Sequence, residues 1–192
     1  MPSLLPSWNE FRLFASMFLR HPLMLGSAFP SSRYLVDHLL SKVNFRRAQV
    51  VIEYGPGVGT FTRHLLARMR QDARLVAVET NAEFVTILKQ RFRDPRLIAV
   101  HGSAAEMDSI LADVGLAEAD YIISGIPFTT LPDGVREQIL AASRDVLSDD
   151  GAFLAYQYTR AALPYLRSVF SRIICEFEPR NILPAQLFVC EP

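Results

Sequence analysis

Two hydrophobic periods alternate along the chain from about residue 48 onward. Short apolar runs that predict buried strands cover residues 49–54, 75–79, 97–101, 120–124 and 152–158. Stretches in which apolar residues recur every three or four positions, the period of an amphipathic helix, cover residues 60–69, 82–92, 103–111, 133–147 and 161–170. Because repeated strand–helix units place consecutive strands parallel, a mostly parallel sheet with helices on both faces is predicted.

Two further strands are predicted at the end of the chain, over residues 172–177 and 186–190. No helical pattern separates them, so they should pair in antiparallel fashion. The sequence therefore predicts an α/β fold with a seven-stranded, mostly parallel sheet whose last strand is antiparallel.

The N-terminal region carries two additional predicted helices. One covers residues 7–20, where aromatic and apolar side chains recur at helical spacing until His21-Pro22 ends the pattern. The other begins after Ser31 or Ser32, either of which can cap it, and continues to about Lys42. We expect residues 1–47 to belong to the same domain as the α/β unit at 48–192.

Composition narrows the choice of partners and compartments. A chain of 192 residues, half of them apolar, suits one globular domain. Its 20 basic and 20 acidic residues cancel, which disfavours a nucleic-acid partner, yet residues 1–47 hold six Lys and Arg against two acids. No apolar run is long enough to span a membrane and no secretory signal begins the chain, so we expect a cytoplasmic protein with buried thiols.

The strongest local motif is a glycine-rich loop that follows the first predicted strand, Glu53-Tyr54-Gly55-Pro56-Gly57-Val58-Gly59-Thr60. Glycines let the backbone approach a ligand closely, and the N-terminus of the next helix faces that ligand. A dinucleotide site requires its third glycine where Thr60 stands, whereas here the third glycine comes earlier, at Gly59. The loop therefore favours a nucleoside with a compact methionine tail over a dinucleotide.

Three further strand ends carry candidate ligand contacts. Glu79 ends the second strand, where a carboxylate can accept hydrogen bonds from both ribose hydroxyls. The third strand ends in His101-Gly102-Ser103-Ala104, where an adenine edge would lie, and we interpret His101 as structural. The fourth ends in Ser124-Gly125-Ile126-Pro127-Phe128, where backbone carbonyls can hold an amine and Phe128 can offer a π-face to a cationic nitrogen. No cluster has metal-ligand spacing, so no metal is expected.

Together these segments resemble the class I, Rossmann-like methyltransferases that depend on S-adenosylmethionine, over residues 48–190. Within that superfamily, Gly125-Ile126-Pro127-Phe128 resembles the N-[IL]-P-[YF] motif of the ribosomal RNA adenine dimethyltransferases. Gly125 replaces the asparagine of that motif and so removes a side-chain amide that would hold an adenine amine. This departure argues against adenine as the acceptor.

Other segments are similar, in the same order along the chain, to the signatures of a second branch. They are residues 18–22 and 26–33 near the N-terminus, 124–127 (S-G-[LI]-P), 157–159 (Q-[FY]-[ST]) and 181–185 (N-[IL]-P-P-A). The branch is that of the bacterial phospholipid N-methyltransferases, which act on phosphatidylethanolamine. The chain departs from its pattern at Leu183, which replaces a proline, and at Ser103, where many methyltransferases have an adenine-binding aspartate.

The resemblance implies S-adenosylmethionine as cofactor, S-adenosylhomocysteine as product and no metal. The residues that match the cofactor motifs are Glu53, Tyr54, Gly55, Gly57, Gly59, Thr60, Phe61, Glu79, Thr80, Gly102, Ser103, Ala104, Ser124, Gly125, Ile126 and Pro127. It further implies stepwise methylation of phosphatidylethanolamine to its mono-, di- and trimethyl forms. The expected contacts to this phospholipid are an aromatic surround (Phe128, Tyr156, Tyr158), a base (Tyr34 or Tyr158) and a phosphate ligand (Arg180 or Arg33).

An anionic membrane surface is the partner expected for the first helix. Its apolar and basic contacts would be Trp8, Phe11, Phe14, Phe18, Arg12 and Arg20. The protein would then associate peripherally with the inner membrane from the cytoplasm. Two alternatives stay open: a methyltransferase of another amine, such as an ornithine-type aminolipid or a ribosomal RNA adenine, and a non-catalytic protein that binds S-adenosylmethionine.

Overall fold

The computed structural model describes residues 31–192. The predicted helix at 7–20 and its expected membrane contacts lie outside the described residues.

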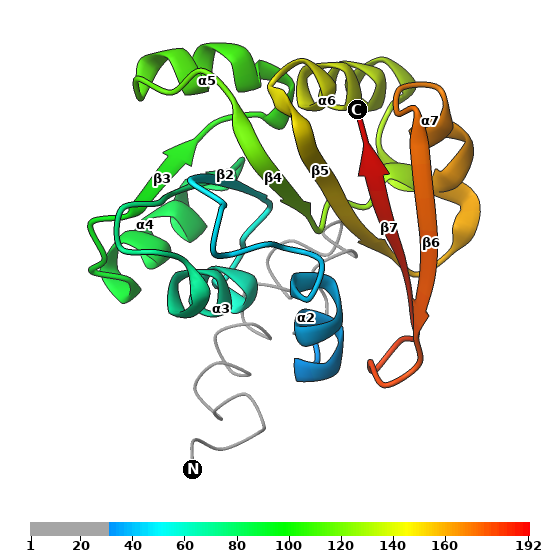
Figure 1. Cartoon of the computed structure of the whole chain (residues 1–192), viewed down its shortest axis with the longest axis horizontal. Helices are drawn as coiled ribbons and strands as arrows, with labels where there is room; N and C mark the ends of the chain where they lie inside the picture. The colour runs from blue at the N-terminus through cyan, green and yellow to red at the C-terminus, as the bar shows by residue number, and fades with distance from the viewer. Residues whose placement is uncertain (1–30) are drawn as a thin grey trace.

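One seven-stranded sheet organises the described part of the chain, in the order β3-β2-β1-β4-β5-β7-β6 (Figure 1). Its strands are β1 (Val50–Tyr54), β2 (Arg74–Glu79), β3 (Leu97–His101), β4 (Ala119–Ser124), β5 (Leu147–Gln157), β6 (Arg172–Glu178) and β7 (Ala185–Glu191). The first five strands pair in parallel, and β7 runs antiparallel to both β5 and β6. The predicted α/β fold, with a mostly parallel sheet and an antiparallel last strand, is confirmed.

Helices cover both faces of the sheet. They are α2 (Arg33–Leu40), α3 (Thr60–Arg68), α4 (Ala82–Arg91), α5 (Met107–Asp113), α6 (Asp133–Asp145) and α7 (Leu163–Arg167), with short 3-10 turns η2 (Ala104–Glu106), η3 (Phe128–Thr130) and η4 (Arg160–Ala162). Figure 1 shows α5 and α6 on one face and α2 and α3 on the other. Strand β1 alternates between two cores: Ile52 packs with α5 and α6, and Val51 packs with α2 and α3. A parallel strand that is buried on both faces explains the continuous apolar run in the sequence.

Helix α2 belongs to the same packed unit as the sheet. Ser32 caps it, because its hydroxyl accepts a hydrogen bond from the backbone N–H of Leu35. Leu35 and Leu39 are completely buried against residues of β1, β4 and β5. The described part of the predicted N-terminal extension, residues 31–47, therefore packs on the sheet.

Several element bounds differ from the predictions. Strand β5 begins at Leu147 rather than at 152, because Asp149-Asp150-Gly151 belongs to the strand. The helix predicted at 161–170 is shorter, since α7 ends at Arg167, and the one predicted at 103–111 begins as the 3-10 turn η2. Local apolar periodicity identifies the helices and strands. It does not identify their end residues, which depend on where the backbone hydrogen bonds stop.

The order of the strands reverses at β1, which lies between β2 and β4. Ligands of open α/β sheets bind beyond the carboxyl ends of the strands at such a switch point. The glycine-rich loop, Glu79 and the segment after Ser124 all follow strands that end at this edge.

Candidate functional site

The glycine-rich loop connects β1 to α3 in a backbone conformation that needs glycine. Gly55, Gly57 and Gly59 have φ values of 65°, 53° and 84°, in the left-handed region. At Gly59 a Cβ would also lie 2.4 Å from the ring of Phe92. The loop therefore turns directly into the N-terminus of α3, as close spacing of its glycines predicts.

Glu79 lies at the end of β2, where its buried carboxylate is held by the loop. Its Oε2 accepts a hydrogen bond from the backbone N–H of Gly57 at 3.1 Å, and its Oε1 accepts one from Asn81 at 3.0 Å. Oε1 also accepts a hydrogen bond from the Thr80 hydroxyl at 3.4 Å. A carboxylate has about four acceptor positions, so Oε2 keeps capacity for a further donor. Such a donor would come from the cavity that Glu79 lines.

That cavity, of about 380 Å³, lies along the switch point and will be called the larger cavity. Nine of the residues expected to bind cofactor line it: Gly55, Glu79, Thr80, Gly102, Ser103, Ala104, Gly125, Ile126 and Pro127. Its volume falls within the range of small-molecule and cofactor sites. The ends of four strands, β1 to β4, are thus brought together around one space.

The other expected cofactor residues lie behind the larger cavity rather than in its lining. Glu53 is buried and accepts a hydrogen bond from the Thr62 hydroxyl at 2.6 Å, and its burial raises its pKa to about 7. Tyr54 reaches Ser143 in the core, and Ser124 accepts a hydrogen bond from the backbone of Ile126. The loop residues Gly57 and Gly59 and the first residues of α3, Thr60 and Phe61, complete this supporting layer.

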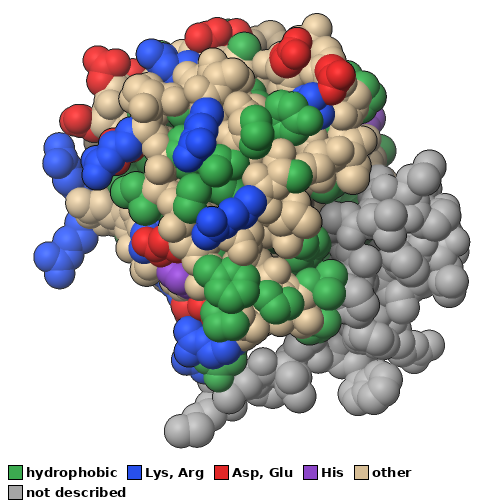
Figure 2. Space-filling view, turned by 90° about the vertical axis from the view of Figure 1, so that its right-hand side faces the viewer, with side chains coloured by type: hydrophobic (Ala, Val, Ile, Leu, Met, Phe, Trp, Pro, Cys, Tyr) green, Lys and Arg blue, Asp and Glu red, His purple; other side chains and the backbone are tan. Residues whose placement is uncertain are grey.

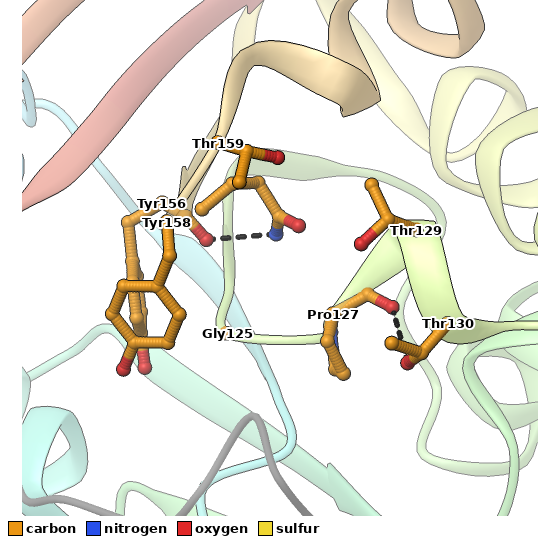
Figure 3. Close-up of a pocket in the computed structure, with 8 residues that line it drawn as sticks. Gly125, Pro127, Thr129, Thr130, Tyr156, Tyr158 and Thr159 are labelled. Carbon is orange, nitrogen blue, oxygen red and sulfur yellow. Dashed lines mark hydrogen bonds between the residues drawn. The ribbon is translucent and has the colours of Figure 1, made fainter. Parts of the chain in front are cut away.

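A smaller cavity of about 220 Å³ adjoins the larger one (Figure 3). Gly125, Pro127, Thr130 and Tyr156 line both spaces. The rest of the smaller cavity is formed by Thr129 and by Gln157, Tyr158 and Thr159. Figure 3 shows Tyr156 and Tyr158 on one side of the space, and Thr129 and Thr130 on the opposite side. The lining residues are aromatic, hydroxylic or amide-bearing, and none of them carries a carboxylate or a basic group.

Tyr156 is fixed at the boundary between the two cavities. Its ring stacks on Phe61 with centroids 5.5 Å apart, and its hydroxyl accepts a hydrogen bond from Ser31 at 3.3 Å. A Cβ on Gly125 would lie 2.7 Å from this hydroxyl oxygen. Position 125 therefore has no room for a side chain while the tyrosine stays in place.

Comparison with known proteins assigns the chain to a family. The model of the family described as ribosomal RNA adenine dimethylase matches residues 21–126, more than half of the chain. The chain belongs to the ribosomal RNA adenine dimethylase family. The match covers the glycine-rich loop, Glu79 and the end of β4, and stops before most of the smaller cavity. This family member is a class I methyltransferase that depends on S-adenosylmethionine.

Curated relatives of this family member differ in how much of the chain they match. An ornithine lipid N-methyltransferase of Singulisphaera acidiphila is 28% identical over 188 residues, 95% of this chain and 96% of its own length. Ribosomal RNA small subunit methyltransferase A of Geobacter metallireducens is 40% identical over 85 residues, 44% of this chain and 30% of that enzyme. The similarity to the ornithine lipid N-methyltransferase extends over nearly the whole chain, and therefore over residues of both cavities. The similarity to the ribosomal RNA methyltransferase covers less than half of the chain.

Solved structures share the fold. The 1,6-didemethyltoxoflavin-N1-methyltransferase of Burkholderia thailandensis, solved with its acceptor and S-adenosylhomocysteine, aligns over all of this chain and 92% of its own, with a TM-score of 0.65 and 17% identity. Precorrin-6y C5,15-methyltransferase of Geobacter metallireducens covers 83% of this chain and 88% of its own, with a TM-score of 0.64 and 17% identity. At this identity the likeness concerns the fold alone.

The larger cavity fits S-adenosylmethionine. The left-handed glycines let the loop backbone approach the ligand without a Cβ, and Oε2 of Glu79 presents an acceptor position suited to a ribose hydroxyl. Ser103 accepts a hydrogen bond from Ala105 and caps η2 where an adenine edge would lie. Among residues 31–192 no group of three or more His, Cys, Asp or Glu side chains could hold a metal ion. In the same residues, no helix is long and apolar enough to cross a membrane.

Four residues expected to contact the acceptor do not line either cavity. Phe128 is fully buried and packs on Phe153. Tyr34 is exposed at the start of α2, under the guanidinium of Arg180, which also pairs with Glu178. Arg33 pairs with Asp37 on the same helix. Of the residues expected at the acceptor, Tyr156 and Tyr158 line the smaller cavity.

Burial raises the pKa of both cavity tyrosines. The pKa of Tyr156 rises to about 12, and that of Tyr158 also lies above its ordinary value. Deprotonation of either hydroxyl therefore requires a higher pH than in a free tyrosine. This favours Tyr158 as a neutral hydrogen-bond partner and aromatic wall rather than as a base.

Three residues that the sequence interpretation did not place at the site hold the smaller cavity in shape. Gln157 donates a hydrogen bond from Nε2 to the backbone carbonyl of Ile126 at 2.7 Å, which ties β5 to the segment after β4. Arg136 is buried, lies 3.5 Å from the ring centre of Tyr165 and donates to the carbonyls of Phe128 and Leu131. Ser31 supports Tyr156. The partners of Gln157 and Ser31 are distant in sequence, so spacing gives no signal for these contacts. Arg136 donates to backbone carbonyls five and eight residues before it, which no side-chain pattern identifies.

Proposed function

We propose that this methyltransferase transfers methyl groups from S-adenosylmethionine to the free amine of an aminolipid with an ornithine-type head group. The contact between Gly125 and Tyr156 carries the proposal, because the tyrosine fills the space of the asparagine that would hold an adenine amine. The full-length similarity to an ornithine lipid N-methyltransferase supports the same acceptor class. Phosphatidylethanolamine, which the sequence motifs favoured, is the second aminolipid to be tested.

The cofactor supplies a methyl group on an electrophilic sulfonium, so the protein needs no covalent intermediate. The chain's contribution is position: the smaller cavity adjoins the larger one along Gly125, Pro127, Thr130 and Tyr156. An acceptor amine held there meets the cofactor cavity directly. Holding two reactants in line can supply a large part of a rate enhancement.

The amine must lose its proton before it attacks. For an alkyl amine similar to lysine this costs about 4–5 kcal/mol at neutral pH. The smaller cavity contains no carboxylate that would stabilise the ammonium form, and its apolar walls penalise that charge further. Hydroxyl oxygens of Tyr156 or Tyr158 can accept the remaining N–H, which keeps the lone pair free for the methyl group.

The product needs a different kind of contact. Each methylation removes an N–H donor, so a methylated ammonium depends on aromatic faces rather than hydrogen bonds. Tyr156 and Tyr158 provide aromatic rings at one wall of the smaller cavity (Figure 3). This suits an enzyme that methylates one nitrogen more than once.

A parallel acceptor assay tests the proposal. The full chain would be incubated with radiolabelled S-adenosylmethionine and, in separate reactions, an ornithine lipid, phosphatidylethanolamine and unmodified small-subunit ribosomal RNA. We expect label in the ornithine lipid, and none with Glu79→Ala, which removes the carboxylate expected to hold the cofactor. Label in ribosomal RNA alone would refute the proposal. Preferential labelling of phosphatidylethanolamine would identify the acceptor as this phospholipid instead of an ornithine lipid.

A further inference from the structure

Exposed apolar side chains gather where the β6–β7 connection meets the start of α2. Ile182 and Leu183 in the connection are 62% and 46% exposed, Phe177 near the end of β6 is 49% exposed, and Tyr34 is 49% exposed. Four of the six exposed large hydrophobic side chains among residues 31–192 lie here. We call these four residues the apolar tip. Figure 2 faces this side of the molecule and shows hydrophobic side chains collected at its lower end, beside Lys and Arg.

Two arginines flank the apolar tip, of which Arg33 is paired with the partly exposed carboxylate of Asp37. Arg180 and Arg33 have exposed side chains, and residues 179–190 contain no Asp or Glu. Glu178, the partner of Arg180, is buried beneath it, so the guanidinium is the group that faces outward. Exposed aliphatic and aromatic groups flanked by arginine match the boundary between the acyl chains and the anionic head groups of a bilayer.

The turn that presents the apolar tip is held rigidly. The Asn181 side chain accepts a hydrogen bond from the backbone N–H of Ser32 at 2.8 Å and donates one to the carbonyl of Leu183 at 2.9 Å. The Ser32 hydroxyl donates to the carbonyl of Arg180 at 2.8 Å. Ile182 and Leu183 are therefore kept in solvent by a preorganised turn, which lowers the entropy lost when a partner covers them.

The same contacts lead from the apolar tip to the acceptor site. Ser31 directly precedes Ser32 and donates to Tyr156, which lines both cavities. We propose that the apolar tip is a membrane-docking surface that enters the interface of a bilayer and brings the smaller cavity to the lipid head groups. The choice of a bilayer as occupant rests on the proposed function, because an aminolipid acceptor resides in one.

Vesicle co-sedimentation of the full chain tests this surface. Ile182→Ser/Leu183→Ser would be compared with wild type and with Ile174→Ser, which changes an exposed apolar residue of β6 outside the tip. The vesicles would consist of phosphatidylcholine with and without phosphatidylglycerol. We expect the tip variant to partition about tenfold more weakly, Ile174→Ser to match wild type, and Ile182→Trp/Leu183→Trp to bind more tightly. Equal melting temperatures would show that all the variants fold.

The inference is overturned if the tip variant binds vesicles as wild type does, or if Ile174→Ser weakens binding equally. A change in oligomeric mass with unchanged vesicle binding would assign the apolar tip to a protein partner instead.

Methylation of a monomeric short-chain aminolipid separates docking from function. Retained methylation by the tip variant, with weakened vesicle binding, supports both. If wild type methylates no aminolipid while the tip variant still loses vesicle binding, the proposed function fails and the docking surface stands.

Discussion

The hydroxyl oxygen of Tyr156 lies 2.7 Å from the point that a Cβ on Gly125 would occupy. Stacking on Phe61 and the hydrogen bond from Ser31 keep the tyrosine from moving away. Tyr156 therefore leaves no room for a side chain at position 125, which carries asparagine in the ribosomal RNA adenine dimethyltransferase motif.

Gly125→Ala should weaken both cofactor binding and acceptor turnover, because this position lines both cavities. Overpacking at such a site costs about 1–3 kcal/mol. Tyr156→Phe removes the atom nearest to the added methyl, so the same alanine should cost less in that background. Calorimetric dissociation constants for S-adenosylmethionine in all four proteins would measure the coupling. Equal costs in the two backgrounds would show that the contact does not restrict position 125.

Gly59→Ala should destabilise the protein more than Gly115→Ala. Both glycines have left-handed φ values, 84° and 73°, so both substitutions carry a backbone cost of about 1–2 kcal/mol. Only at Gly59 does the added Cβ also meet Phe92, since nothing lies within 4 Å of it at Gly115. Urea unfolding of the two variants would measure the difference. Equal losses would mean that the Phe92 contact relaxes without cost.

Glu53→Gln should stabilise the protein at pH 8 and have little effect near pH 5. Burial raises the pKa of Glu53 to about 7, so the folded state holds this proton more tightly than the unfolded chain does. The free energy of unfolding therefore falls as the pH rises from about 4.5 to about 7. A shift of this size corresponds to roughly 3 kcal/mol.

The Glu53 prediction is checked by urea unfolding of both proteins at a series of pH values. Thr62→Val is the matched variant, because it removes the hydrogen bond that lowers the pKa of Glu53. We expect a steeper loss of stability with pH in that variant. A constant difference between Glu53→Gln and wild type at all pH values would show that the carboxyl does not titrate in this range.

The sheet and the cofactor edge could be predicted from the sequence because both depend on local patterns. Strand–helix alternation implies parallel pairing, and strand ends of parallel neighbours meet at one edge, so Glu79 and the glycine-rich loop could be placed together. The Gly125–Tyr156 contact depends on how β4 pairs with β5, with Ser124 opposite Ala155. No periodicity encodes that pairing.

Side-chain direction explains the acceptor residues that sequence reasoning placed elsewhere. Phe128 is the last residue of the Gly125-Ile126-Pro127-Phe128 segment, yet it turns into the core because η3 begins there. Arg180 and Tyr34 come together through the β6–β7 turn and α2, away from both cavities. A sequence motif identifies the segment that lies near the site. The burial or exposure of each side chain then decides which residues of that segment can contact a ligand.

Arg136→Lys should raise the KM for the acceptor more than the dissociation constant for S-adenosylmethionine, because Thr129 lines only the smaller cavity whereas Thr130 lines both. The guanidinium donates to the carbonyls of Phe128 and Leu131 and stacks on Tyr165, and thereby fixes the segment that carries Thr129 and Thr130. Lysine has no planar fork with which to bind two carbonyls and an aromatic face together.

Because Arg136 is buried, the same substitution should also cost about 1–3 kcal/mol of unfolding free energy. Arg172→Lys is the control, since Arg172 pairs with Glu191 on the surface, where an ion pair contributes at most about 1 kcal/mol. A purely structural role for Arg136 would lower stability without a change in KM. A rise in the acceptor KM that exceeds the rise in the cofactor dissociation constant is therefore the result that assigns Arg136 to positioning the acceptor wall.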